Sequence, residues 1–187
     1  MLIDLNRPSS SGPSGLNVSK NLEAIRAVNL QSAKLLETYF SEFESNCTYF
    51  YLSEGKVSSY QLLNYFLEKF NQPATVYITT WGMTETAVRQ LATRKQSGQI
   101  KELYFVFSEQ TKVNKANEYQ LALSIATSHK IMPCHAKIYL IKTHDYQVSI
   151  VTSANLNRNN KLESGTITGS LETLNFYTEF LNNKICK

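Results

Sequence analysis

Hydrophobic residues along the chain alternate between short strand-like runs and stretches with helical spacing. Apolar residues at helical spacing predict a first helix from Val18 onward: Leu22, Ile25, Ala33, Leu36, Tyr39 and Phe40. The aromatic run 48–52 then predicts a short buried strand. Ser58 or Ser59 is expected to cap the next helix, whose apolar residues are Leu62, Leu63, Phe66, Leu67 and Phe70.

The same alternation continues through the middle of the chain. Residues 75–80 and 103–107 are predicted as strands, and residues 85–96 and 117–129 as helices. Three successive strand-then-helix units favour a parallel sheet flanked by helices.

The last third of the chain has a different pattern. Residues 135–141 and 147–152 are rich in β-formers, and the turn at 143–145 predicts that they form a hairpin. Residues 165–169 add another predicted strand, and residues 171–181 a closing helix.

The chain is long enough for one domain. Its 187 residues show no internal repeat, so we expect a single copy of any site. Residues 8–15 are small, polar and rich in Pro and Gly, which predicts a flexible leader over residues 1–16. The rest, residues 17–187, is interpreted as one domain.

Composition restricts the partners and the location of the protein. The formal net charge is +4, which favours a polyanionic partner. Cys47, Cys134 and Cys186 are an odd number of cysteines without metal-ligand spacing, so we expect free thiols in a cytosolic protein. No membrane-crossing run or signal-peptide pattern is present in the sequence, and the expected location is cytoplasmic, without a membrane partner.

Polar residues of the predicted hairpin form a candidate phosphate site. His135 and Lys137 share one face of the first hairpin strand, while Ser153 and Asn155 continue a face of the returning strand. Strand pairing would therefore gather an imidazole, an ammonium, a hydroxyl and an amide. Lysine supplies charge, Ser and Asn supply neutral donors, and histidine can attack or transfer a proton.

These residues resemble a known pattern over positions 130–170. His135-Ala-Lys137, the apolar run IYLI, Ser153-Ala-Asn155 and Glu163-Ser-Gly165 together resemble the HxK…SxN…E signature of the phospholipase D superfamily. The resemblance implies an α/β fold, a three-layer α/β/α sandwich with a mixed, mostly parallel sheet. One position departs from the family pattern, because Lys142 stands where the family usually has Asp.

The resemblance also implies a role for each motif residue. His135 would attack phosphorus and form a phosphohistidine, while Lys137 and Asn155 would hold the non-bridging oxygens. Ser153 would bind at the edge of the site, and Glu163 would hold an imidazole nitrogen. The scheme requires neither metal nor cofactor.

A second histidine is needed to protonate the leaving oxygen. Because the chain has one motif, the resemblance implies a homodimer in which the His135 residues of two subunits face each other. The first hypothesis is thus a metal-independent phosphodiesterase, with a nuclease favoured over a phospholipid enzyme because of the basic balance. Two alternatives stay open: a non-catalytic nucleic-acid-binding or assembly module, and the cleavage subunit of a larger defence or mobile-element system.

Several nearby residues have weaker claims to function. Ser53-Glu54-Gly55 and Trp81-Gly82 follow predicted strands and are equally consistent with pocket lining or with turns. Arg158 and Lys161 are interpreted as solvated loop residues. Cys134 is expected to point away from the site. The remaining histidines, His129 and His144, are expected to face solvent or cap a helix.

Overall fold

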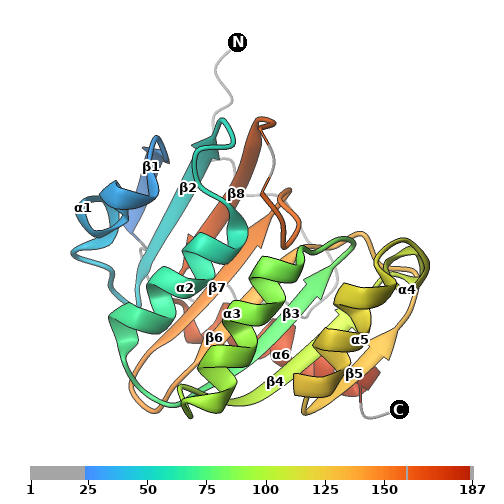
Figure 1. Cartoon of the computed structure of the whole chain (residues 1–187). Helices are drawn as coiled ribbons and strands as arrows, with labels where there is room; N and C mark the ends of the chain where they lie inside the picture. The colour runs from blue at the N-terminus through green and yellow to red at the C-terminus, as the bar shows by residue number, and fades with distance from the viewer. Residues whose placement is uncertain (1–23, 159, 186–187) are drawn as a thin grey trace, which may run out of the picture.

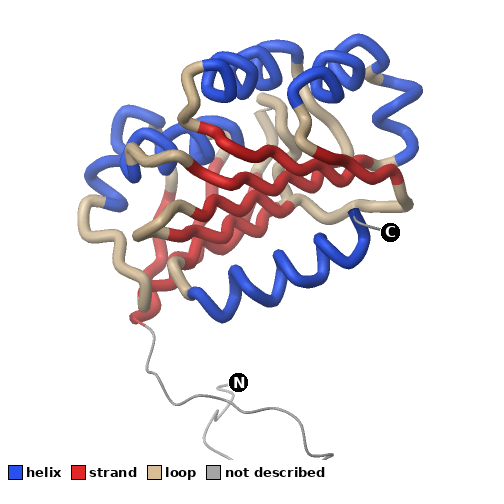
Figure 2. The backbone as a smooth tube through the Cα atoms, turned by 90° about the horizontal axis from the view of Figure 1, so that it is seen from below, coloured by secondary structure: helices blue, strands red, loops and turns tan. Residues whose placement is uncertain are grey.

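The computed structural model describes residues 24–158 and 160–185, so the predicted leader over residues 1–16 lies outside the described residues. The described chain forms an eight-stranded sheet with helices on both faces (Figures 1 and 2). In strand order the sheet is β1-β2-β8-β7-β6-β3-β4-β5. The strands are β1 (Ala24–Asn29), β2 (Cys47–Ser53), β3 (Ala74–Thr80), β4 (Ile100–Phe107), β5 (Ser128–Ile131), β6 (Ile138–Lys142), β7 (Gln147–Thr152) and β8 (Glu163–Thr168).

The sheet is mixed, and the prediction of a mostly parallel sheet is wrong. β1–β2, β3–β4 and β4–β5 are parallel pairs, whereas β2–β8, β8–β7, β7–β6 and β6–β3 are antiparallel. The last three strands of the chain are inserted between β2 and β3. The strand–helix units from β3 to β5 are parallel neighbours as predicted, but β2 and β3 are separated by the inserted strands, which local periodicity does not show.

The helices are η1 (Ala33–Leu35), α1 (Leu36–Phe40), α2 (Ser59–Phe70), α3 (Glu85–Gln96), α4 (Glu109–Asn114), α5 (Ala116–Ile125) and α6 (Leu171–Ile185). The helix predicted after Ser58 or Ser59 is confirmed as α2. Ser58 is its N-cap, and the backbone N–H of Ser58 donates to Gln61 Oε1 at 2.9 Å in a capping box. The helix predicted over residues 85–96 is confirmed as α3 with the same bounds.

Two predicted helices differ from the structure. The helix predicted from Val18 is wrong over residues 24–29, which form strand β1 along the open edge of β2. The helix predicted over residues 117–129 ends at Ile125, and β5 begins at Ser128. In both places pairing with a neighbouring strand outweighs apolar spacing that also fits a helix.

Helices α2, α3 and α5 cover one face of the sheet, and α6 covers part of the other (Figures 1 and 2). On the second face, β1, β2 and β8 are left bare, with Ile25, Phe50 and Leu52 at least half exposed. A hollow of about 600 Å³ lies there, lined by residues that include Phe50, Leu52 and Thr166. Within the described residues, no helix is both long enough and apolar enough to span a membrane.

Candidate active site

The candidate site residues meet at one edge of the sheet because of the strand directions. β2, β3, β4 and β7 end at this edge, and the antiparallel strands β6 and β8 begin there. His135 and Lys137 precede β6, Ser153 and Asn155 follow β7, and Glu163 begins β8. The HxK segment is hydrogen-bonded to the residue that precedes the SxN segment, since the backbone N–H of Thr152 donates to the Lys137 carbonyl at 3.0 Å.

His135 and Lys137 contact each other through the lysine ammonium. Lys137 Nζ donates to the His135 carbonyl at 2.8 Å and lies 3.2 Å from both imidazole nitrogens. The Lys137 residue is 6% exposed, whereas His135 is exposed at the surface. Burial lowers the pKa of Lys137, and the neighbouring Cys134 and Glu163 act in the opposite direction. The pair therefore presents an accessible imidazole beside a shielded cation.

Asn155 is joined to the His135 segment through Trp81, at the end of β3. The backbone N–H of Trp81 donates to Asn155 Oδ1 at 3.1 Å, which fixes the side-chain amide. The Trp81 and His135 ring centroids are 6.2 Å apart. The loop after β7 is also bonded to the loop after β3, since the N–H of Leu156 donates to the Gly82 carbonyl at 3.0 Å.

Ser153 and Glu163 form a second pair across the β7–β8 junction. Ser153 Oγ donates to the Glu163 carboxylate and accepts from the backbone N–H of Ser164 at 3.0 Å. The carboxylate is close enough to affect the pKa of Lys137. The structure thus places His135 and Asn155 against Trp81, Lys137 against His135, and the Ser153–Glu163 pair at the same edge of the sheet. Their catalytic roles stay predictions.

A buried tyrosine donates a hydrogen bond to the backbone of the SxN segment. Tyr139, on β6, is fully buried, and its hydroxyl donates to the Ala154 carbonyl at 2.9 Å. Burial raises the pKa of Tyr139 above its ordinary value, so the hydroxyl keeps its proton for this bond. Ser59, at the start of α2, donates to the Asn155 carbonyl at 2.5 Å. These two hydroxyls fix the backbone on either side of the Asn155 side chain.

We expect Tyr139→Phe to lower the free energy of unfolding by about 1–3 kcal/mol, because a buried carbonyl loses its donor. Urea denaturation measures the change. Tyr146→Phe is the matched control, since Tyr146 is 51% exposed, and it should cost less than about 0.5 kcal/mol. Equal losses in the two variants would contradict the supporting role of Tyr139.

The other two histidines of the chain contact residues outside the candidate site. His144 is in the β6–β7 turn at the opposite end of the hairpin, and its side chain is 93% exposed and paired with Asp145. Lys142 and Asp145 are at that same end, so neither contacts the site edge. His129 is on β5 and packs beside Phe107 and Tyr119, and its predicted place at a helix end is wrong.

A cavity of about 420 Å³ adjoins His135. It includes Trp81, for which the sequence was equally consistent with pocket lining and with a turn. Trp81, Glu109, Gln110, Cys134 and His135 are among the residues that line it. Cys134, which was expected to point away from the site, is a lining residue of this cavity and also packs against the hydrophobic cluster that includes Leu140 and Leu174. Residues 132–137 are not a strand, so side-chain alternation does not hold there. The position of Trp81 after a strand was the signal for a pocket residue.

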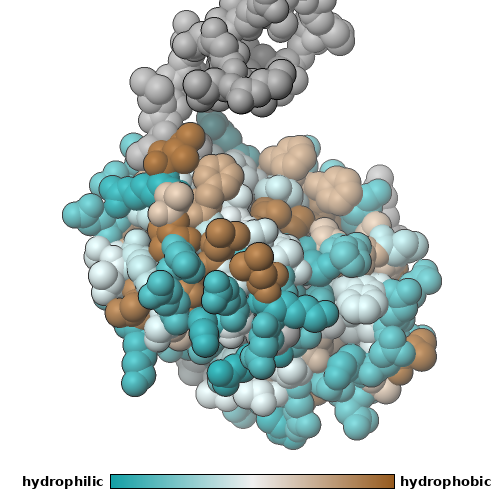
Figure 3. Space-filling view, turned by 90° about the horizontal axis from the view of Figure 1, so that it is seen from above, coloured by the Kyte–Doolittle hydropathy of each residue, from teal (hydrophilic) through white to brown (hydrophobic). Residues whose placement is uncertain are grey.

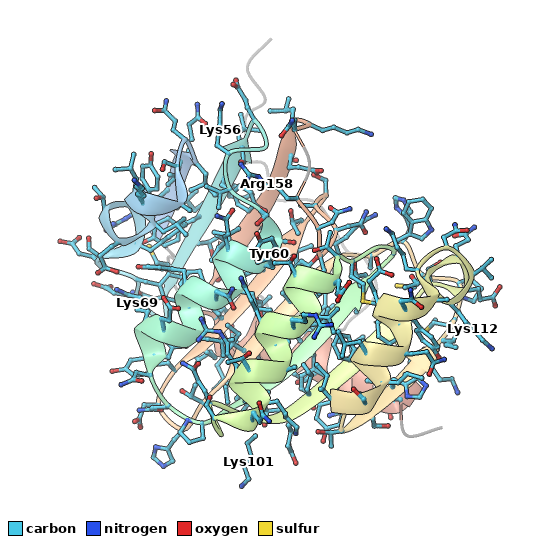
Figure 4. All side chains as sticks on the ribbon, viewed as in Figure 1. Lys56, Tyr60, Lys69, Lys101, Lys112 and Arg158 are labelled. Atoms are coloured by element: carbon cyan, nitrogen blue, oxygen red, sulfur yellow. The ribbon has the colours of Figure 1, made fainter. Side chains whose placement is uncertain are left out.

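Basic side chains lie on the outside of this end of the molecule. Lys56 and Arg158 both project there, near Tyr60 at the start of α2 (Figure 4). Arg158 and Lys161 are exposed, as expected for a loop. Among the residues that the structure describes, no group of three or more His, Cys, Asp or Glu side chains could hold a metal ion.

Comparison with known proteins identifies the fold alone. No protein-family model matches the sequence, and no curated protein matches it. A crystal structure of polyphosphate kinase from Porphyromonas gingivalis is similar over 80% of this chain, with a TM-score of 0.59 and 14% sequence identity. The matched part is 29% of the length of that enzyme.

Proposed function

We propose that this chain is a metal-independent phosphodiesterase, with nucleic acid as its substrate, that acts through a phosphohistidine. The observation that supports it most is the group of His135, Lys137 and Asn155 at one edge of the sheet. Lys137 Nζ lies 3.2 Å from the imidazole nitrogens, and Asn155 is bonded to the residue beside that imidazole. An accessible nucleophile with a cation and an amide donor next to it matches the needs of phosphoryl transfer.

Each residue has a defined part in the proposed reaction. A ring nitrogen of His135 attacks phosphorus, the P–N bond forms, and the bond to the leaving oxygen breaks. Lys137 and Asn155 stabilise the negative charge on the non-bridging oxygens. Water then attacks phosphorus, the P–N bond breaks, and His135 is released. Ser153 binds at the edge of the site and Glu163 holds an imidazole nitrogen, and the hydrogen bond between Ser153 and Glu163 positions both side chains.

Proton transfer in this scheme requires a second histidine. His129 and His144 lie elsewhere in the fold, so we propose that a second copy of the chain supplies its own His135. That imidazole gives a proton to the leaving oxygen and later accepts one from water. A two-fold axis near His135 then makes the two half-sites equivalent.

The fold comparison supports the general class of reaction. Polyphosphate kinase is by name a phosphoryl-transfer enzyme. The sequence motif and the fold comparison both support phosphoryl-transfer chemistry in this proposal. The +4 formal charge and the exposed Lys56 and Arg158 favour a polyanionic substrate.

The test is hydrolysis of bis(p-nitrophenyl) phosphate by the purified chain in EDTA, with light scattering to measure its mass. EDTA-resistant turnover by a dimer supports the proposal. A folded dimer without turnover would favour the alternative of a nucleic-acid-binding module. Binding to nucleic acid that weakens with salt and survives the loss of His135 would identify that module.

Deprotonation of Lys137 should determine the alkaline side of the pH–rate profile. Burial lowers the pKa of Lys137 from its ordinary value of 10.5. As the pH is raised, the ammonium should therefore lose its proton, and the rate should fall, before pH 10.5 is reached. In Lys137→Arg the guanidinium stays charged, so the alkaline fall should move to higher pH although the rate is lower. Initial rates between pH 6 and 11 check this. An unchanged alkaline fall in the arginine variant would contradict the role of Lys137.

A further inference from the structure

The cavity beside His135 does not have the chemistry of a phosphate site. Of the residues described along its walls, none is Lys or Arg, and Glu109 contributes a carboxylate. A phosphate bound within it would therefore face the Glu109 carboxylate, with no Lys or Arg in the described lining. Lys137 is not among the lining residues, although its Nζ lies 3.2 Å from the imidazole nitrogens of His135. The cavity suits a neutral group attached to the phosphate, and about 420 Å³ is within the range of small-ligand pockets.

Trp81 provides a fixed aromatic surface in this cavity. Trp81, the one tryptophan of the chain, is 41% exposed. The backbone is held at both ends, because its N–H donates to Asn155 Oδ1 at 3.1 Å and its carbonyl accepts from Thr111 Oγ1 at 3.0 Å. The indole N–H donates to Gln110 Oε1. An exposed indole with one hydrogen bond on its ring N–H and two on its backbone is pre-organised for stacking.

Polar groups next to the indole suit the edge of a planar ring. Gln110 and Glu109 follow β4, and Ser108 Oγ lies 3.1 Å from Gln110 Oε1. Carboxylate and amide groups can accept from or donate to ring nitrogens and exocyclic groups. Flat aromatic stacking with polar groups at the rim is the usual way in which proteins bind unpaired bases.

We infer that the Trp81 cavity binds a nucleobase adjacent to the scissile phosphate, which makes the substrate a single-stranded nucleic acid or an unpaired nucleotide. This inference rests on the proposed function for the position of the phosphate. The base stacks on the indole, and the phosphate attached to it reaches His135, whose ring centroid is 6.2 Å from that of Trp81. A base in a duplex is already stacked, and it would have to leave the helix to enter the cavity.

The test compares two probes with the same number of phosphates: octathymidylate and an eight-unit abasic tetrahydrofuran phosphodiester. His135→Asn prevents turnover during the measurement and keeps a polar side chain at the cavity wall. Octathymidylate should bind about 5- to 150-fold more tightly than the abasic chain and should quench the fluorescence of the single tryptophan.

Two variants separate stacking from charge. In Trp81→Ala the preference for octathymidylate should disappear, and in Trp81→Phe most of it should remain, both measured by anisotropy of labelled probes. Equal affinity for the two probes would overturn the inference. Equal affinity together with hydrolysis of a short-chain phosphatidylcholine would assign the cavity to a lipid headgroup instead.

Failure of this inference and failure of the proposed function give different results. Turnover of bis(p-nitrophenyl) phosphate without a base preference would leave the phosphodiesterase standing and remove the base subsite. A base preference without turnover would support the subsite in a protein that only binds.

Discussion

Replacing His135 with alanine is expected to lower EDTA-resistant hydrolysis of bis(p-nitrophenyl) phosphate by about 10³-fold or more. In the proposed dimer each subunit contributes the same imidazole, once as nucleophile and once as general acid. The substitution thus removes both functions from each site. Because His135 is exposed, its loss should leave the fold unchanged, which circular dichroism and the melting temperature can verify.

The matched control is His144→Ala, at the far end of the β6–β7 hairpin. Its side chain is 93% exposed and pairs only locally with Asp145, so turnover should stay within about twofold of wild type. Acid quenching of the wild-type reaction should also trap phosphate on His135, identified by mass spectrometry. Full activity in His135→Ala, or equal losses in both variants, would refute the proposed nucleophile.

The second large effect is on stability. Phe66→Ala should lower the free energy of unfolding by about 3–5 kcal/mol, the range for a phenylalanine removed from a core. Phe66 is fully buried where α2 meets the sheet. The centroid of its ring is 5.4 Å from that of Phe40 and 4.9 Å from that of Phe43. The cavity left by the substitution therefore cannot close without moving both rings.

Phe176→Ala is the matched control for this prediction. Phe176 is on α6 and is 68% exposed, so the same substitution should cost less than about 0.5 kcal/mol. Urea unfolding followed by circular dichroism measures both variants. Similar losses would mean that α2 is not packed on the sheet through Phe66.

The bare face of β1, β2 and β8 distinguishes this sheet from one covered on both sides. In the view from above, hydrophobic side chains gather on part of the surface, beside a largely hydrophilic remainder (Figure 3). Ile25 is 72%, Phe50 51% and Leu52 50% exposed. Sequence patterning did not reveal this face, because alternation in β2 indicates two faces without showing that α6 stops short of one of them.

Where local chemistry decides structure, the sequence was sufficient. Ser58 and Gln61 complete the capping box of α2, and the apolar stripe behind them is buried as its spacing indicates. The strands at β2, β3, β4, β6 and β7 were located by their β-branched and aromatic runs. The candidate residues His135, Lys137, Ser153, Asn155 and Glu163 also came from the sequence alone, because their order along the chain is itself the signal.

Only the tertiary structure decided which of these segments meet. Strand order depends on contacts between residues far apart in the chain, and periodicity carries no information on them. The insertion of β8, β7 and β6 between β2 and β3 places the Asn155 loop against Trp81. Residues 132–137 have no repeating backbone geometry, so the side chains of Cys134 and Lys137 are oriented by hydrogen bonds and packing and not by alternation. The sequence thus identified the candidate residues, and long-range pairing of the strands determined the cavity beside them.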